Sequence, residues 1–421
     1  MEEIFDIMKL KIPLIKSIID YVSFKDRLQL KKLLNKKVTK ILLTSQIKIK
    51  EFSNSTNFNL KFTLTGHTSE ICCVVHLKEF RENLIISGGY DNTLRFWELN
   101  NGKCLGNYKG DYNIIRDIIY PSKLYKEVVI IRDDSHKVSI FDLRENKVSH
   151  VFQFSSKVNS IVLNKNGDKF NKMIAISEPN VGLYFYDMLS AKLISTFSRK
   201  NNEDNYIGYL LYEKEGELHH IFECYDENKG CLINLNVSKL PNIELTKVME
   251  CNKGLLICYI YIKHLNMIVS SKKTEGRGFL EIFYLNTNTN KTLEFKNVGS
   301  LAYDKYSNLL FFENENLSVI TLDLITLEEK HTFTHHKEKI PKVICLKHYE
   351  GVYVTCSWDG SCSIFDVKNQ KLIMILDHSK GFSCCVFVTT LIYLDKTYII
   401  SCGSSNNKDI KVWEILDLLY N

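Results

Sequence analysis

The sequence contains no pair of cysteines at the CxxC spacing that is typical of structural zinc sites, although it has 13 cysteines in 421 residues. An odd number of cysteines without regular spacing also argues against a disulfide framework. We therefore expect the cysteines to be small buried apolar residues in a reducing compartment, and we predict no metal site.

The sequence also lacks any apolar run as long as a membrane span, and no N-terminal signal sequence is visible. Both absences favour an intracellular protein, cytoplasmic or nuclear, with no membrane partner. The apolar fraction of 45% and the charged fraction of 25% are ordinary values for a globular chain. A chain of this length can bury a large core.

Motifs that would indicate catalysis are missing as well. The sequence has no nucleophile elbow, no paired-carboxylate motif and no glycine-rich phosphate loop. The adjacent pairs His219-His220 and His335-His336 are poor chelates, because successive side chains of a strand point to opposite faces. We predict a non-enzymatic protein that uses no cofactor and no small-molecule substrate.

Positive charge is in excess by 6, and the whole excess lies at the N-terminus. Residues 1–51 hold 12 lysines and arginines against 6 acidic residues, which leaves 43 of each sign in the remainder. A large region without net charge makes nucleic-acid binding an improbable function.

One stretch, Leu60–Leu99, shows how the rest of the chain is organised. It contains three short apolar runs separated by turn-rich segments, and the pair Gly66-His67 precedes the first run. The runs are rich in Ile, Val, Leu, Phe and Trp, which favour strands. Three strands cannot bury both faces alone, so the unit requires neighbours of the same kind.

The end of the third strand of this unit recurs seven more times. Each recurrence has an aromatic residue or leucine, mostly followed by a polar residue, and the spacing is 39 to 49 residues. The eight positions are Trp97-Glu98, Phe141-Asp142, Tyr186-Asp187, Leu235-Asn236, Phe283-Tyr284, Leu322-Asp323, Phe365-Asp366 and Trp413-Glu414. This spacing is typical of one blade of a propeller.

The repeated unit resembles the blade of the WD-repeat β-propeller family, which carries a Gly-His pair, a Ser or Thr, an Asp and a terminal Trp-Asp. The resemblance implies a buried hydrogen-bond relay within the blade, since a buried His and Asp each require a partner. The matching residues are His67, Ser87, Asp91 and Trp97 in the first unit, His336, Thr355 and Asp359, with Phe365 in the tryptophan place, in the seventh, and His378, Ser401 and Trp413 in the eighth.

The predicted fold is therefore all-β: an eight-bladed WD-type β-propeller behind a small N-terminal α-helical module. We assign residues 1–50 to the helical module, residues 51–59 to a linker and residues 60–417 to the propeller. The last unit lacks a fourth strand and Leu60–Leu64 has no unit of its own. We predict that the two pair and close the ring, which removes exposed sheet edges.

The N-terminal module has apolar residues at helical spacing, namely Leu10, Leu14, Ile18, Tyr21, Val22 and Leu28. This spacing resembles a divergent F-box. That resemblance implies docking on a Skp-family adaptor of an SCF ubiquitin ligase. The residues expected to make the adaptor contact are Leu14, Ile18, Tyr21, Val22 and Phe24. An F-box-like module followed by WD-type blades is the architecture of F-box/WD-repeat substrate receptors, whose partners are the adaptor and a target protein that can be phosphorylated.

An alternative is a general WD-repeat scaffold of a cytosolic or nuclear complex, with the N-terminal helices packed on the propeller. For the receptor, the resemblance implies arginines that bind a phosphorylated target. Arg116 matches the place of such an arginine in the second unit, and Arg132 lies near another. A salt bridge from Arg116 to Asp117 or Asp133 is the alternative to target binding.

Overall fold

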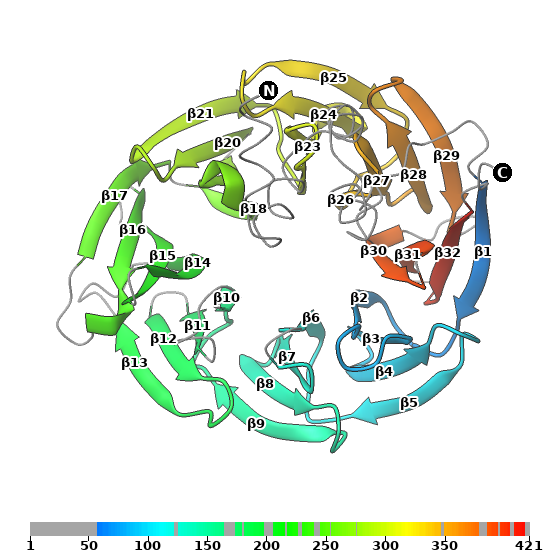
Figure 1. Ribbon diagram of the computed structural model, residues 1–421, viewed down its shortest axis with the longest axis horizontal. Helices are drawn as coiled ribbons and strands as arrows, with labels where there is room; N and C mark the ends of the chain where they lie inside the picture. Colours follow the sequence, from blue (N-terminus) through cyan, green and yellow to red (C-terminus); the bar gives the residue numbers. More distant parts are fainter. Residues whose placement is uncertain are drawn as a thin grey trace, which may run out of the picture.

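The chain forms a ring of blades around a central axis (Figure 1). The computed structural model describes residues 57–416, except residues 122–124, 164–172, 179–180, 198–204, 215–216, 226–229, 240–244, 253, 275, 347–348, 379–384, 395 and 405–407. Within these residues the chain folds into eight sheets, each of four antiparallel strands. The predicted eight-bladed all-β propeller is confirmed. The predicted helical module at residues 1–50 lies outside the described residues.

The blades follow one another in chain order, and the first four contain four consecutive strands each. Blade 1 contains β2 (Ile71–His76), β3 (Leu84–Gly89), β4 (Thr93–Glu98) and β5 (Cys104–Lys109). Blade 2 contains β6 (Ile115–Ile119), β7 (Val128–Asp133), β8 (Lys137–Asp142) and β9 (Lys147–Gln153). Blade 3 contains β10 (Ser160–Leu163), β11 (Met173–Glu178), β12 (Gly182–Asp187) and β13 (Leu193–Phe197). Blade 4 contains β14 (Asn205–Lys214), β15 (Glu217–Tyr225), β16 (Gly230–Asn236) and β17 (Leu245–Cys251).

The last four blades continue the pattern until the ring closes. Blade 5 contains β18 (Leu255–Ile262), β19 (Met267–Thr274), β20 (Arg277–Tyr284) and β21 (Thr289–Phe295). Blade 6 contains β22 (Leu301–Asp304), β23 (Leu309–Asn314), β24 (Ser318–Asp323) and β25 (Glu329–Thr334). Blade 7 contains β26 (Lys342–Cys345), β27 (Val352–Cys356), β28 (Ser361–Asp366) and β29 (Lys371–Asp377). Blade 8 contains β30 (Cys385–Tyr393), β31 (Lys396–Gly403), β32 (Ile410–Leu416) and, from the other end of the chain, β1 (Asn57–Leu64). Among the residues that the structure describes, three short 3-10 helices connect strands: η1 (Val237–Lys239), η2 (Lys263–Leu265) and η3 (Glu315–Leu317).

Ring closure depends on β1, which pairs antiparallel with β32 as the outer strand of blade 8 (Figure 1). The pairing that the sequence predicts for Leu60–Leu64 is confirmed. The strand begins earlier than expected, because Asn57–Asn59 also pair with β32 although the sequence assigns them to a linker. Phe58 explains the extension, since it packs on the apolar cluster between blades 7 and 8.

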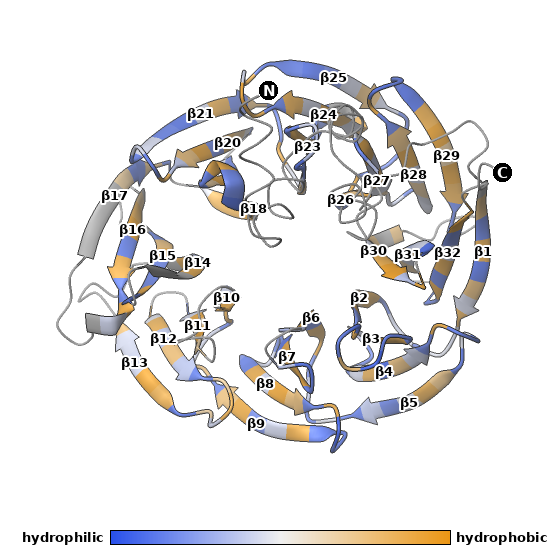
Figure 2. Ribbon diagram, viewed as in Figure 1, coloured by the Kyte–Doolittle hydropathy of each residue, from blue (hydrophilic) through white to orange (hydrophobic). Residues whose placement is uncertain are grey.

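Apolar clusters lie between the blades and join them. Each of the eight clusters draws on two neighbouring blades, so every blade depends on the next for its core. Of the eight residues predicted to mark the ends of third strands, all but Tyr186 are buried. Figure 2 shows the resulting alternation of hydrophobic and hydrophilic residues along many strands, with a largely hydrophilic outer strand β21.

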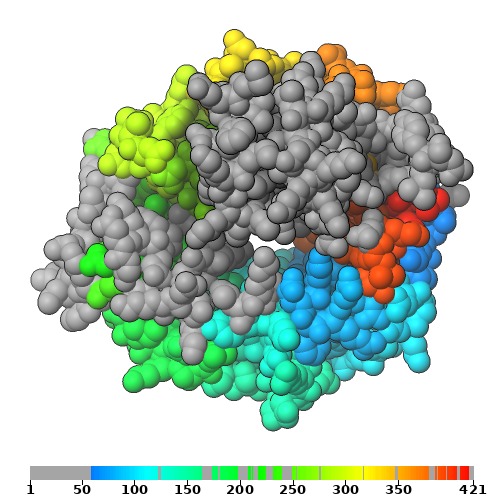
Figure 3. All heavy atoms as spheres, in the orientation of Figure 1, coloured from blue at the N-terminus to red at the C-terminus, as the bar shows by residue number. Residues whose placement is uncertain are grey.

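One face of the ring carries the loops that precede the first strand and follow the second strand of each blade. The four strands of a blade alternate in direction, so the start of the first strand and the end of the second lie on the same side. Backbone hydrogen bonds tie these loops together, from Tyr90 N to Glu70 O at 2.8 Å in blade 1 and from Trp358 N to Lys339 O at 2.9 Å in blade 7. We call this side of the ring the relay face. A space-filling view shows blades 1 to 3 following one another in contact along the lower edge of the ring, from blue through teal to green (Figure 3).

Candidate functional site: the relay face and the interface of blades 4 and 5

In blade 1 the structure brings together the four residues of the predicted relay. His67 Nδ1 lies 2.8 Å from Asp91 Oδ2, and His67 Nε2 lies 2.7 Å from Ser87 Oγ. The indole N–H of Trp97 donates to the same Ser87 oxygen at 2.8 Å. A neutral imidazole that donates from Nδ1 to Asp91 and accepts from the Ser87 hydroxyl satisfies every one of these contacts.

Asp91, whose side chain is only 2% exposed, is the last residue of the relay and also holds the neighbouring turn. It accepts hydrogen bonds from Thr68 N at 3.0 Å and from Thr93 Oγ1 at 2.8 Å. Burial raises the pKa of Asp91, but the hydrogen bonds from His67, Thr68 and Thr93 outweigh burial and lower the pKa to about 2. The relay therefore connects a charged carboxylate on the relay face to the buried Trp97.

Blades 7 and 8 contain versions of the same arrangement. In blade 7, His336 Nδ1 lies 2.9 Å from Asp359 Oδ2 and Nε2 lies 2.7 Å from Thr355 Oγ1. In blade 8, Ser401 Oγ lies 2.6 Å from His378 Nδ1 and accepts from Trp413 Nε1 at 2.9 Å. The three relays therefore occupy consecutive blades, because blade 8 is followed by blade 1 around the ring.

In blades 2 and 3 a different residue holds the loops, and the sequence analysis missed it. In each of these blades, a carboxylate at the end of the second strand accepts hydrogen bonds from the loops, as Asp91 of the relay does in blade 1. Asp133 accepts from Asn113 N at 3.2 Å and from Ser135 N at 2.9 Å. Glu178 accepts from Ser155 Oγ and Ser156 N, both at 2.6 Å. An acidic residue immediately before the turn after the second strand is the signal that could have revealed this substitution.

Arg116, which the resemblance assigns to target binding, lies in a charged cluster on the relay face. Its Nε donates to Asp134 Oδ2 at 2.7 Å and its Nη1 donates to Tyr90 Oη at 2.7 Å. Lys157 Nζ lies 3.0 Å from the other Asp134 oxygen. Hydrogen bonds from Arg116 and Lys157 lower the pKa of Asp134 below its usual value. The cluster joins loops of blades 1, 2 and 3.

The alternative interpretation of Arg116 as a salt-bridge residue has the right chemistry but the wrong partner. The sequence suggested Asp117 or Asp133, whereas the ion pair forms with Asp134, because Arg116 is the extra residue of a β-bulge between Ile115 and Asp117. Arg132, the second predicted target-binding residue, donates to Val158 O at 3.2 Å and lies 3.8 Å from Asp117 Oδ2.

A second group of charged residues is buried between blades 4 and 5. Lys272 Nζ lies 2.5 Å from both Glu223 Oε1 and Glu281 Oε2, and all three side chains are inaccessible to solvent. Burial disfavours the charged form of Lys272, but the two carboxylates outweigh burial and raise its pKa. Burial raises the pKa of Glu281 despite the attraction of Lys272. This ion cluster links β15, β19 and β20 across the two blades.

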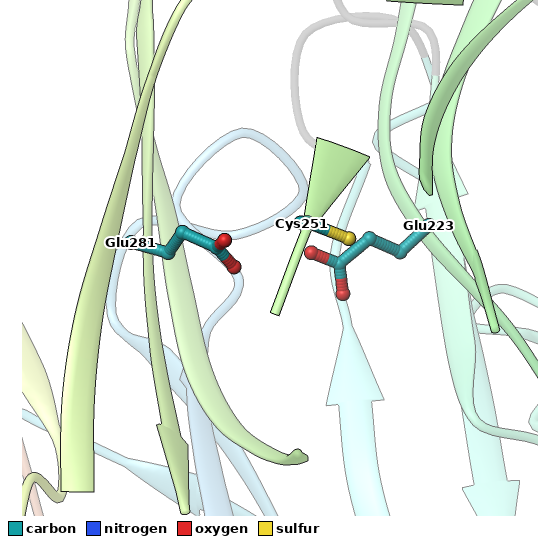
Figure 4. A group of neighbouring side chains, drawn as sticks. All are labelled: Glu223, Cys251 and Glu281. Atoms are coloured by element: carbon teal, nitrogen blue, oxygen red, sulfur yellow. The ribbon is translucent and has the colours of Figure 1, made fainter. Parts of the chain in front are cut away.

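The same place contains the ligand types of a metal site. The Cys251 thiol and the carboxylates of Glu223 and Glu281 come within 4.8 Å of one another in the described part of the chain (Figure 4). The Lys272 ammonium already lies between the two carboxylates, so a metal ion would have to displace it. The arrangement is therefore a buried Glu-Lys-Glu salt bridge, and the positive charge is supplied by the protein.

The predicted adaptor-binding residues Leu14, Ile18, Tyr21, Val22 and Phe24 lie outside the described residues. In the part of the chain that the structure describes, no helix has the length and apolar character to cross a membrane.

Comparisons with known proteins agree with the fold. The family "WD domain, G-beta repeat" matches residues 58–98 and 327–366. The first match covers most of β1 and the first three strands of blade 1, and the second covers β25 and the first three strands of blade 7. The chain is 26% identical over 144 residues to Autophagy-related protein 16 of Arabidopsis thaliana, and 31% identical over 94 residues to the WD repeat-containing protein pop2 of Schizosaccharomyces pombe. These matches cover 34% and 22% of this chain but only 27% and 13% of the relatives.

Two solved structures resemble most of this chain in fold. The computationally designed Ika8 protein superposes with a TM-score of 0.62 at 15% identity, covering 84% of this chain and 98% of the designed chain. Sqt1 of Saccharomyces cerevisiae superposes with a TM-score of 0.65 at 11% identity, covering 86% of this chain and 98% of Sqt1. At such identities the likeness concerns the fold alone. The two matched repeats, the WD-repeat relative and the eight blades together support a WD-repeat β-propeller.

Proposed function

We propose that this chain is a non-enzymatic substrate receptor, whose propeller holds a target protein while residues 1–50 bind a Skp-family adaptor of an SCF-type ubiquitin ligase. The arrangement of side chains on the relay face is the observation that supports target binding by the propeller. Hydrogen bonds to the buried relays and to the carboxylates of Asp133 and Glu178 hold its loops in place. Charged and aromatic side chains of three blades gather around Asp134. A rigid surface with such groups suits protein recognition.

The cluster around Asp134 supports a negatively charged target. Arg116 and Lys157 both contact this carboxylate, so the cluster holds two positive charges and one negative charge. A phosphate group on a target would compete with Asp134 for Arg116, because a guanidinium binds either anion through two parallel hydrogen bonds. Arg132 belongs to the same proposal, since it lies on β7 next to Asp133 and Asp134.

The adaptor-binding half rests on the resemblance of residues 1–50 to an F-box. The proposed contacts are Leu14, Ile18, Tyr21, Val22 and Phe24, and an apolar surface of this kind fits an adaptor groove. The WD-repeat propeller that follows is the second element of the receptor architecture.

Titration of the full-length protein with a Skp-family adaptor tests the proposal. We expect micromolar or tighter binding, and we expect Ile18→Glu and Val22→Glu to abolish it because each places a charge in the apolar contact. Lys31→Glu, a charge reversal at a residue outside the five proposed contacts, is the matched control and should bind normally. A folded protein that does not bind the adaptor would contradict the ligase role and favour the general WD-repeat scaffold instead.

A further inference from the structure

A cavity of about 480 Å³ lies on the relay face where blades 5, 6 and 7 meet. Its apolar walls come from Ile257 on β18, Val298 before β22, Leu317 in η3 and Pro341 before β26. Its volume is within the range of pockets that bind small molecules or single side chains of a partner. The cavity does not include the cluster around Asp134.

A buried carboxylate, Glu313, lines this cavity. Its residue is 5% exposed, and burial raises its pKa despite the attraction of Lys339 and Lys273. Its hydrogen-bond partner is the backbone N–H of Ile340. Gly299 makes room for the carboxylate, because a Cβ at this glycine would lie 2.0 Å from Glu313 Oε2. The site is thus shaped to hold a carboxylate that has no ion pair with any described residue.

Blade 4 contains a glutamate at the corresponding position of the repeat, and that glutamate has a cation. Glu223 lies three residues after His220, which pairs with Leu235, and Glu313 lies three residues after Leu310, which pairs with Leu322. Leu235 and Leu322 mark the ends of third strands in their blades. Glu223 binds Lys272, which comes from the next blade around the ring.

In blade 7 the residue that corresponds to Lys272 is a serine. Lys272 lies four residues after Ile268, which pairs with Phe283, and Ser357 lies four residues after Tyr353, which pairs with Phe365. Serine carries no charge, and Ser357 Oγ donates to Glu338 O at 3.0 Å. The repeat therefore supplies an ammonium to Glu223 and none to Glu313.

The two lysines near the cavity, Lys273 and Lys339, do not act as the cationic partner of Glu313. Both Lys273 and Lys339 are exposed, and the Lys339 ammonium lies 5.2 Å from the centre of the Trp358 ring. Neither forms an ion pair with Glu313. A buried carboxylate without a cation is costly, and a cation from outside would remove that cost.

We propose that this cavity receives a lysine or arginine side chain of the target protein, whose charged group pairs with Glu313. The aliphatic part of such a side chain packs on Ile257, Val298, Leu317 and Pro341. Asn314 Oδ1 is a second acceptor in the cavity, buried and without a hydrogen bond from any described residue. This inference rests on the proposed function, of which it names the chemistry of one target residue.

Binding of peptide pools to the full-length protein tests the inference. Each pool contains nonapeptides with one fixed central residue, which is lysine, arginine, acetyl-lysine, citrulline or glutamate, between randomised flanks. We expect the lysine or arginine pool to be retained and the uncharged analogues to be lost. Glu313→Gln should weaken retention about tenfold or more, because it removes a charge-assisted hydrogen bond in a desolvated site.

Two further variants make the result specific. Glu315→Gln alters an acidic residue of the same cavity that is half exposed and already paired with Lys296, so it should leave retention unchanged. Lys339→Ala should strengthen retention, because it removes a competing positive charge. Equal retention by Glu313→Gln, preference for the glutamate pool or no retention of a basic pool would overturn the inference. The adaptor titration separates this outcome from failure of the proposed function, since it depends on residues 1–50 and not on Glu313.

Discussion

Trp97 and His67 share one hydrogen-bond partner, the Ser87 hydroxyl oxygen, which lies 2.8 Å from the indole nitrogen and 2.7 Å from the imidazole nitrogen. Trp97 is on the third strand of blade 1, Ser87 is on the second and His67 precedes the first. One oxygen therefore connects three segments of the blade, and the loss of this oxygen leaves two buried polar groups without partners.

Ser87→Ala is expected to lower the free energy of unfolding by about 2–4 kcal/mol, because the Trp97 N–H and His67 Nε2 both become unsatisfied. Ser87→Thr keeps the hydroxyl, and blade 7 uses Thr355 at the same place, so this variant is the matched control. Urea unfolding followed by tryptophan fluorescence measures both. A Ser87→Ala protein as stable as the Thr variant would show that the shared oxygen contributes little.

Stability at acid pH should depend on Asp91. Its pKa in the folded protein is about 2, below the usual 3.8, because the hydrogen bonds from His67, Thr68 and Thr93 outweigh burial. The contribution of this carboxylate is therefore fully present above about pH 4 and is lost as the pH falls towards 2. The difference in unfolding free energy between the protein and Asp91→Asn should shrink over that range. A difference that is constant with pH would contradict the assignment.

Lys272→Met should destabilise the protein severely, by about 3–5 kcal/mol, because it leaves Glu223 and Glu281 buried without a cation. Lys273→Met, at the exposed neighbouring position, is the control and should change stability little. Combining Lys272→Met with Glu223→Gln and Glu281→Gln should recover part of the loss. Thermal unfolding of the four proteins measures the effect, and similar midpoints for the two lysine variants would refute it.

Asp134→Asn tests the target-binding role of Arg116. If a phosphorylated target competes with Asp134, removal of this negative charge should strengthen binding of a phosphopeptide and Arg116→Glu should abolish it. Binding is measured by fluorescence anisotropy at two salt concentrations, because charged contacts weaken as salt rises. Unchanged affinity in both variants would remove Arg116 from the binding site.

Much of the fold could be predicted from residues that repeat. The residues from Trp97 to Trp413 that mark third strands all lie on the third strand of a blade, because an aromatic or leucine residue at this position fills the space between neighbouring blades. The closing strand could be predicted for a different reason, since Leu60–Leu64 and the incomplete last blade each lacked a partner.

The charged groups were harder to predict because they form between blades. Lys272 and Glu223 belong to different repeats, and their contact depends on how the blades are rotated about the axis. The sequence suggested Asp117 or Asp133 as the partner of Arg116, whereas the structure shows Asp134. The difference arises from a β-bulge at Arg116, which apolar spacing does not predict. The role of Asp133 and Glu178 was missed since neither residue resembles the relay that it replaces.

The pairing of β1 with β32 also has a consequence for the order in which the molecule is made. Asn57 pairs in register with Leu416, so β1 leaves the ribosome long before its partner and must wait until residue 416 has been synthesised. Blades 1 to 7 each hold their four strands in consecutive order and can assemble as they emerge. Among the eight described blades, blade 8 is the one that recruits a distant segment, and we expect this non-local pairing to be the slow step that closes the ring.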